Sequence, residues 1–265
     1  MKNTKELVAE CLLVSEKKAG ESARQAFGLG VAGGGYIGLA GVGVLTLGSQ
    51  GAGANPGIIS LLSAMLFCAG LAMVLTAGGE LFTGNCLMPL GALRRQGLWG
   101  GLLKNWFWVY VGNAVGALIV LALVAGGGFL AKEGVATAFG TQAMALATKK
   151  MSHSFVAAFC RGVLCNWLVA LSVWIGFAGV TVTDKVVGLM LPITLFVFSG
   201  YEHCVANLFF LPAGFLSASM THTALPFSLA GGLAGNLVPV TLGNIVGGAV
   251  LVALLYGWVY PASDK

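Results

Sequence analysis

Two glutamates offer the first chemistry in this chain, because each interrupts a strongly apolar run. The surrounding stretches share the pattern Gly-x-Glu-x-x-x-x-Asn, 122 positions apart: Gly78-Gly79-Glu80-Leu81-Phe82-Thr83-Gly84-Asn85 and Gly200-Tyr201-Glu202-His203-Cys204-Val205-Ala206-Asn207. Two carboxylates that faced an anion would repel it. We therefore expect Glu80 and Glu202 to point away from any substrate path, to accept hydrogen bonds from main-chain N–H groups, and to hold the local backbone in shape.

A histidine and a threonine in these stretches are stronger candidates for contact with a substrate. His203 is the only histidine inside an apolar segment. An ionisable side chain at membrane depth is a functional hypothesis by default, and imidazole exchanges protons near neutral pH. His203 stands where the first stretch has Leu81, and Thr83 adds a hydroxyl donor. We predict that His203 and Thr83 line one site.

The composition predicts that these stretches lie in a membrane. Of 265 residues, 57% are hydrophobic and 9% are charged, whereas a soluble domain carries about 25% charged residues. The 41 glycines suit helices whose backbones approach closely in a membrane. The net charge of +5 is spread over loops, which gives no sign of nucleic-acid binding. We expect an integral membrane protein that contacts lipid.

Six apolar segments are each long enough to cross a bilayer, which needs about 20 residues. The segment at about 58–92 is too long for one crossing unless it is broken. Between the third and fourth segments, residues 129–150 form a loop with some helix-forming sequence. The predicted spans cover residues 26–48, 58–92, 105–128, 153–179, 187–212 and 236–259.

Lysine and arginine residues in short loops predict the orientation. With the N-terminus inside, ten of them lie on the inner side and three on the outer side. We expect both termini in the cytoplasm and a location in the cell's inner (plasma) membrane. The predicted organisation is an N-terminal cytoplasmic surface helix at 1–25, a transmembrane channel domain at 26–260 and a C-terminal tail at 261–265.

A second repeated pattern extends the similarity between the two halves. Asn-x6-Gly-Asn-x-Val-Gly occurs from Asn105 and again from Asn236, 131 positions later. Repeat one, at about 26–128, then matches repeat two, at about 153–259. Three spans in each half require the halves to be inverted, and inverted repeats with discontinuous helices build transport sites at the midplane.

Glycines at both stretches disfavour a continuous helix, at about 1 kcal/mol each against alanine. A helix broken at membrane depth directs the N-terminus of a half-helix, with its partial positive charge, at the cavity. Such an end suits a small anion. We expect Asn85 and Asn207 to tie the loose backbone at the breaks.

The sequence leaves two interpretations open for several other residues. Lys149 and Lys150 either snorkel to the interface or attract anions electrostatically. Phe196 and Phe198 either narrow a path or pack as core aromatics. Arg161 lies within the fourth span and needs a partner on another helix, which the sequence does not identify.

The cysteines give little support for an enzyme. None of the six forms a CxxC pair, and the chain has no histidine cluster, P-loop or serine-histidine-aspartate arrangement. Buried cysteine is most often small apolar filler. We expect no enzyme activity, no metal and no cofactor. The alternative is a membrane enzyme or redox subunit that uses Cys86, Cys160, Cys165 or Cys204.

In the two repeated patterns and their surroundings, the chain resembles the formate/nitrite transporter family. The resemblance covers nearly the whole chain and rests on four motifs taken together: Gly78–Asn85, Arg161–Val169, Phe198–Asn207 and Pro239–Gly248. It implies an all-α membrane protein with an aquaporin-like inverted 3+3 repeat of six helices, in which the second and fifth helices are broken. It also implies a homopentamer with one pore in each protomer.

The resemblance further implies roles for particular residues. Leu81 and Phe196 correspond to two hydrophobic constrictions, Thr83 to the threonine of the broken second helix and His203 to the central histidine. The resemblance also implies that a polar group tunes the central histidine, and that this group consists of Lys150, Asn166 and Glu202. It implies that Asn244 lines the pore.

Taken together, these observations predict a channel or proton-coupled permease for a small monovalent anion, with formate as the preferred substrate. A bare charge is costly in an apolar constriction, and a proton shared from His203 would lower that cost. Nitrite and hydrosulfide are alternative substrates, and lactate belongs to the same class. An alternative of another class is a channel for water or other small neutral solutes.

Overall fold

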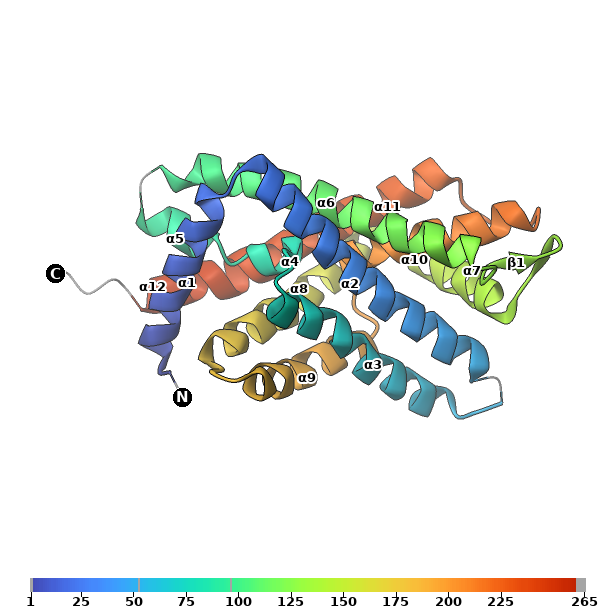
Figure 1. The fold of residues 1–265 in the computed structure, drawn as a ribbon, viewed down its shortest axis with the longest axis horizontal. Helices are drawn as coiled ribbons and strands as arrows, with labels where there is room; N and C mark the ends of the chain where they lie inside the picture. Colours follow the sequence, from blue (N-terminus) through green and yellow to red (C-terminus); the bar gives the residue numbers. More distant parts are fainter. Residues whose placement is uncertain (1, 52, 96, 261–265) are drawn as a thin grey trace.

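The computed structural model describes residues 2–51, 53–95 and 97–260. It is an elongated helical bundle (Figure 1). Helices α1 (Thr4–Gly20), α5 (Pro89–Arg94) and α12 (Leu255–Val259) lie at one end. The hairpin of β1 (Ala131–Lys132) and β2 (Val135–Ala136) lies at the other end with α7 (Ala138–Met151). We call these the α1 side and the α7 side.

The first half of the chain crosses the bundle three times, and the second of these crossings is broken. Helix α2 (Ala23–Gln50) leads to α3 (Pro56–Ala77), and α6 (Leu98–Gly126) completes the half. Between α3 and α5 the helix is interrupted, and only the short α4 (Phe82–Asn85) forms there. Gly78 ends α3 with a left-handed φ of 87°, a conformation that glycine adopts without steric cost.

The second half repeats this course. Helix α8 (Phe155–Ala178) is continuous, whereas α9 (Val182–Phe198) and α10 (Cys204–Met220) are separated by a break. Gly200 turns the chain there with a φ of 68°. The final crossing comprises α11 (Leu229–Ile245), the π-helical segment η1 (Val246–Leu254) and α12. The predicted breaks in the second and fifth helices are therefore confirmed.

The apolar helices give a protein that crosses a membrane several times. Among the described residues, five helical stretches are long and apolar enough to span it: α2, α3, α6, α8 and residues 229–259. The two half-helices α9 and α10 supply the remaining predicted crossing, the fifth in chain order. Large apolar side chains on α3, α6 and α9 face outward, among them Leu62, Leu123 and Leu191. This all-α membrane architecture agrees with the predicted fold class.

Each half contains one helix crossing at which glycines let the two backbones approach closely. Helix α2 packs closely on α6, and α8 packs on α11. A Cβ atom at Gly34 would overlap the main chain of Asn113, and one at Gly162 would lie 2.8 Å from the carbonyl oxygen of Val240. Only glycine permits such close approach of backbones. These crossings bring Asn113 and Asn244 beside the breaks.

The N-terminal segment differs from the expected surface helix. Leu7, Val8 and Cys11 of α1 are buried, because α1 packs against α5, α6 and α8. Serine caps start the next helix in both halves, Ser22 for α2 and Ser154 for α8. The internal repeat therefore starts one helix earlier than predicted, with α1 matching α7. The predicted tail at 261–265 lies outside the described residues.

Candidate functional site

A buried contact between the two breaks forms the centre of the molecule. The Nε2 atom of His203 lies 2.9 Å from the hydroxyl oxygen of Thr83, and both residues are buried. His203 caps α10, where its Nδ1 accepts a hydrogen bond from the main-chain N–H of Ala206 at 3.0 Å. Since Nδ1 is an acceptor, the proton of a neutral imidazole is on Nε2. His203 therefore donates to Thr83, whose own hydroxyl proton is free to donate elsewhere.

Aromatic packing fixes the other face of His203. The ring of Phe196 stacks on the imidazole with centroids 5.9 Å apart. Phe67 packs edge-on against Phe196 at the same centroid separation. Phe196 is buried to 97% (3% exposed), so it is both a core aromatic and a neighbour of the histidine. The two alternatives that the sequence left open for Phe196 are thus compatible.

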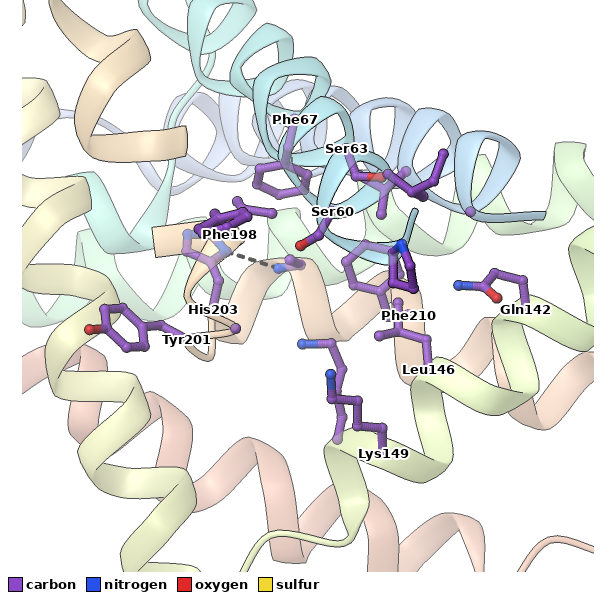
Figure 2. A pocket seen from close by; sticks show the side chains of 18 of the residues that line it. Ser60, Ser63, Phe67, Gln142, Leu146, Lys149, Phe198, Tyr201, His203 and Phe210 are labelled. Carbon is purple, nitrogen blue, oxygen red and sulfur yellow. Dashed lines mark hydrogen bonds between the residues drawn. The ribbon is translucent and has the colours of Figure 1, made fainter. Parts of the chain in front are cut away.

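A cavity of about 510 Å³ opens from this centre toward the α7 side. Figure 2 shows side chains that line it, with a dashed line for a hydrogen bond of His203. The walls come from α2, α3, α7, α9 and α10, and the lining residues include Ser60, Ser63, Phe67, Gln142, Lys149, Lys150, Phe196, Phe198, Glu202 and Phe210. We call this space the α7 vestibule.

A smaller cavity of about 180 Å³ lies on the α1 side of the centre. Leu81 lines it together with side chains from α1, α3 and α8, among them Cys11, Lys18, Leu71, Val173 and Phe177. We call this space the α1 vestibule. Leu81 therefore lines one vestibule and Phe196 the other. Their assignment as constrictions stays a prediction.

A network of polar side chains supports the second break. Lys150 donates to both carboxylate oxygens of Glu202, at 3.1 and 3.2 Å. Asn207 donates to Glu202 at 2.7 Å and to Asn236 at 2.7 Å. Asn236 in turn donates to the main-chain carbonyl of Lys150 at 2.9 Å. The structure thus selects Lys150 over Lys149 as the partner of Glu202.

The first break has a matching network. Lys18 donates to both carboxylate oxygens of Glu80, at 2.6 and 2.7 Å, and to Asn85 at 2.7 Å. Asn85 donates to Glu80 at 2.6 Å and to Asn105 at 2.8 Å. Each of the four residues has a counterpart in the second network: Lys150, Glu202, Asn207 and Asn236.

These networks correct the expected partners of the glutamates. The carboxylates accept from lysine and asparagine side chains rather than from freed main-chain N–H groups, because a buried charge is stabilised best by an opposite charge. Glu202 also lines the α7 vestibule, so it does not point away from the candidate path. Asn85 and Asn207 hold the carboxylates, not the loose backbone.

Sequence reasoning missed Lys18 altogether. The signal was present, because Lys18 lies 132 positions before Lys150, the same interval that separates the caps Ser22 and Ser154. The segment 1–25 carries several other charged residues that hid this match.

Two asparagines hold the breaks from behind. Asn113 accepts from the N–H of Phe82 at 3.0 Å and donates to the carbonyl of Glu80 at 2.8 Å. Asn244 does the same for Cys204 and Glu202, at 2.9 and 3.0 Å. The first N–H group of each half-helix is therefore bound to asparagine and does not face the cavity, in contrast to our expectation.

Asn244 and Asn166 differ from the roles that the resemblance implied. Asn244 is fully buried and is absent from the walls of both vestibules, so within the described chain it supports the backbone instead of lining a pore. Asn166 donates to the carbonyls of Thr83 and Asn244, at 3.1 and 2.7 Å. It does not join Lys150 and Glu202. It supports the Thr83 side of the centre through the main chain.

Charges around the α7 vestibule affect one further histidine. The Nε2 atom of His153 lies 3.9 Å from Glu202. Burial and the neighbouring Arg161 charge lower the pKa of His153 below its ordinary value, against the opposing effect of Glu202. Within residues 2–51, 53–95 and 97–260, Lys150 is the lysine or arginine that lies within salt-bridge distance of Glu202.

The site offers no obvious place for a metal. In the described part of the chain, no three histidine, cysteine or acidic side chains cluster as ligands would. All six cysteines are free thiols. Cys86, Cys165 and Cys204 are fully buried near the centre and pack as small core residues.

Two inverted halves, each with a helix broken at its centre, define a class of membrane transport protein, because the breaks meet between two vestibules. The chain belongs to the formate/nitrite transporter family, whose model matches residues 5–258.

Named relatives and solved structures agree with this assignment. A probable formate transporter of Methanothermobacter thermautotrophicus is 38% identical, over 94% of each chain. The formate channel FocA of Haemophilus influenzae is 36% identical, over 89% of this chain and 87% of its own. A pentameric formate channel with formate bound superposes with a TM-score of 0.77 at 34% identity, over 90% of this chain and 97% of its own. An FNT family ion channel gives 0.84 at 29% identity, over 97% and 99%.

Proposed function

We propose that this protein conducts formate across the cell's inner (plasma) membrane as a homopentamer with one pore in each protomer. Relatives named formate channels or transporters at 34–38% identity support the substrate. The similar solved channel with bound formate is pentameric. The distribution of lysine and arginine supports an inside location for the α1 side and both termini. The α7 vestibule is then the outer one.

The observation that carries the proposal is the buried Thr83–His203 contact between the two vestibules. Formate enters the outer vestibule past Lys149 and Lys150 and reaches Phe196. Beyond Phe196 the anion loses water, which is costly for a bare charge. The free hydroxyl proton of Thr83 offers a hydrogen bond that replaces part of the lost hydration. Leu81 then separates this point from the inner vestibule.

The geometry of His203 favours hydrogen bonding over complete proton transfer. Nδ1 accepts from the N–H of Ala206, so the neutral ring has one proton, on Nε2, and that proton points to Thr83. Giving it away without replacement would leave an anionic imidazolate. A second proton on Nδ1 would break the bond to Ala206. We therefore propose that His203 polarises Thr83, and that any proton that neutralises formate enters from solution with it.

The polar networks around Lys18 and Lys150 have a supporting role in this proposal. Each lysine compensates the charge of a glutamate beside a break, so the two lysine–glutamate pairs together add no net charge. Each vestibule wall therefore keeps an ammonium group without a large field that would trap the anion. Asn166, Asn244 and Glu80 support the backbone on which Thr83 and His203 sit.

Flux measurements in proteoliposomes test the function directly. Formate, nitrite, hydrosulfide and lactate are offered in turn, with a swelling assay for neutral solutes. Formate flux well above that of protein-free vesicles is the expected result. Faster nitrite or hydrosulfide flux would reassign the substrate within the family. Swelling by neutral solutes without any anion flux would overturn the proposal.

A further inference from the structure

One difference between the two halves lies next to the breaks. Leu29 and Arg161 occupy equivalent positions, 132 apart, each directly before a glycine that packs on the partner helix. In both halves this residue accepts a main-chain hydrogen bond from the glutamate of the break. Leu29 accepts from Glu80 at 2.9 Å, and Arg161 accepts from Glu202 at 3.3 Å. The main chains are therefore equivalent, whereas the side chains are not.

The guanidinium of Arg161 adds a second link to the outer break. Its Nη1 donates to the carbonyl oxygen of Gly200 at 2.8 Å. Gly200 is the residue whose left-handed backbone turns the chain out of α9. Arg161 thus binds the break on both sides of Tyr201, through its guanidinium at Gly200 and its carbonyl at Glu202. A hydrogen bond from a charged donor is roughly twice as strong as one between neutral groups.

The inner break lacks this link. Gly78 turns the chain there with a similar left-handed backbone. Leu29 has no donor, and within residues 2–51, 53–95 and 97–260 no other side chain donates to the carbonyl of Gly78. The inner break is held by the main-chain bond to Leu29 and by its asparagine and lysine network. The two breaks therefore differ in how firmly the residue that turns the chain is fixed.

The charge of Arg161 is directed at the backbone. No carboxylate lies within salt-bridge distance of it in the described residues, and Glu202 is already paired with Lys150. Gly200, Tyr201 and His203 line the α7 vestibule, whereas Arg161 is not among its lining residues. The guanidinium thus contacts the break through Gly200 without being part of the vestibule wall. This placement suits a residue that positions the loop and does not touch the anion.

We propose that Arg161 is a positioning residue that locks the outer break, so that His203 keeps its alignment with Thr83 while the inner break stays free to adjust. This inference rests on the proposed function, because it assigns the lock to the anion path. It also makes a statement about backbone protection that is independent of transport. The lock acts through a planar, charged donor that leucine at the equivalent inner position cannot supply.

The test compares Arg161→Leu, Arg161→Lys and the matched control Leu29→Ala in the full chain in lipid nanodiscs. Hydrogen–deuterium exchange is followed at residues 199–202 and 78–80. In Arg161→Leu we expect amide exchange at 199–202 to rise roughly tenfold, as loss of about one hydrogen bond predicts. Arg161→Lys should restore part of the protection, and Leu29→Ala should leave both breaks unchanged.

Formate flux against pH is measured on the same variants. We expect Arg161→Leu to slow formate flux and to alter its pH profile, with partial rescue in Arg161→Lys. Unchanged exchange at 199–202 in Arg161→Leu would overturn the lock. Faster exchange with an unaltered pH profile would overturn its role in aligning His203. If the wild-type protein conducts no formate, the proposed function fails, while the exchange data still decide whether Arg161 fixes the break. If Arg161→Leu does not fold, Arg161→Lys decides the matter by the same two readouts.

Discussion

The Nε2 atom of His203 lies 2.9 Å from the hydroxyl of Thr83, although the two residues come from opposite halves of an inverted repeat. In the repeat, His203 is equivalent to Leu81, and Thr83 is equivalent to Val205. Each half therefore supplies one polar and one apolar side chain at these positions. The scaffold is symmetric, but the pairing of histidine with threonine occurs once. The candidate site is thus a local departure from symmetry on a symmetric backbone.

Thr83→Val tests the hydroxyl that His203 holds. Valine has nearly the same shape, and the equivalent position already carries Val205, so the backbone should tolerate the change. The variant loses the proton that we assign to the anion. Loss of a hydrogen bond of about 1.4 kcal/mol lowers the rate roughly tenfold. Stopped-flow formate uptake by proteoliposomes measures this, with Thr83→Ser as the control that should keep most of the flux. Equal rates in Thr83→Val and wild type would exclude the role.

His203→Asn separates helix capping from the chemistry of imidazole. Asparagine is a good cap, so the start of α10 should persist, but its shorter side chain does not reach Thr83. We expect formate flux to fall and its dependence on pH to change, because Thr83 is no longer polarised when formate and its proton arrive from solution. Flux is measured between about pH 5 and 8. His153→Gln is the control outside the Thr83–His203 contact and should keep the wild-type flux and profile. Unchanged flux and an unchanged profile in His203→Asn would refute the assignment of His203.

Removal of Lys18 should destabilise the protein strongly. The side chains of Lys18 and Glu80 are 21% and 9% exposed, and loss of one partner leaves a buried charge without compensation. Breaking such a pair typically costs about 3–5 kcal/mol. We expect Lys18→Met to lower the melting temperature markedly and Lys18→Met with Glu80→Gln to recover much of the loss.

The exposed Lys149 supplies the control for that experiment. Lys149→Met should leave the melting temperature almost unchanged, because surface charges contribute little. Melting is followed in detergent by intrinsic fluorescence. If Lys18→Met has the same melting temperature as wild type, the network around Glu80 does not stabilise the fold as we describe.

The sequence predicted the scaffold better than the contacts at its centre. Length and hydropathy are local properties, so the spans, the breaks at Gly78 and Gly200 and the inverted repeat could be recognised. The partner of a buried group is a tertiary property. For this reason the lysine partner of Glu80 was missed, Arg161 had no assigned partner, and Asn244 was expected in the pore.

Glu21 predicts a pH-dependent contribution to stability. Burial, followed by the nearby charge of Glu80, raises the pKa of this carboxyl at the end of α1. Its ionisation is therefore easier in the unfolded chain than in the folded one. The favourable contribution of the protonated form is fully present below the unfolded pKa and is lost as the pH rises through the folded pKa.

Glu21→Gln should accordingly raise the melting temperature at pH 7, and the advantage should shrink as the pH approaches 4. The side-chain Nδ2 of Asn105 donates to the carboxylate of Glu21 at 3.3 Å, and it can still donate to the amide oxygen of the introduced glutamine. Melting curves across this range check the sign. A variant that is less stable than wild type at pH 7 would show that the ionised carboxylate is net favourable there.

Gly34→Ala tests whether close helix packing sets the inner break. A methyl group at this position would overlap the main chain of Asn113, so α2 and α6 must move apart. Asn113 would then withdraw from Phe82 and Glu80, which it holds at 3.0 and 2.8 Å. We expect a loss of stability of about 1–3 kcal/mol, the usual cost of overpacking, together with slower formate flux.

Gly28→Ala, on the same helix, is the matched control for Gly34→Ala. A Cβ atom at Gly28 would meet nothing within 4 Å, and alanine favours the helix by up to about 1 kcal/mol. Its melting temperature should equal or exceed that of wild type, with normal flux. If both alanine variants behave alike, glycine at position 34 serves helix flexibility and not the approach of α6. If only Gly34→Ala loses flux, the position of Asn113 links the helix crossing to the break, and through it to Thr83.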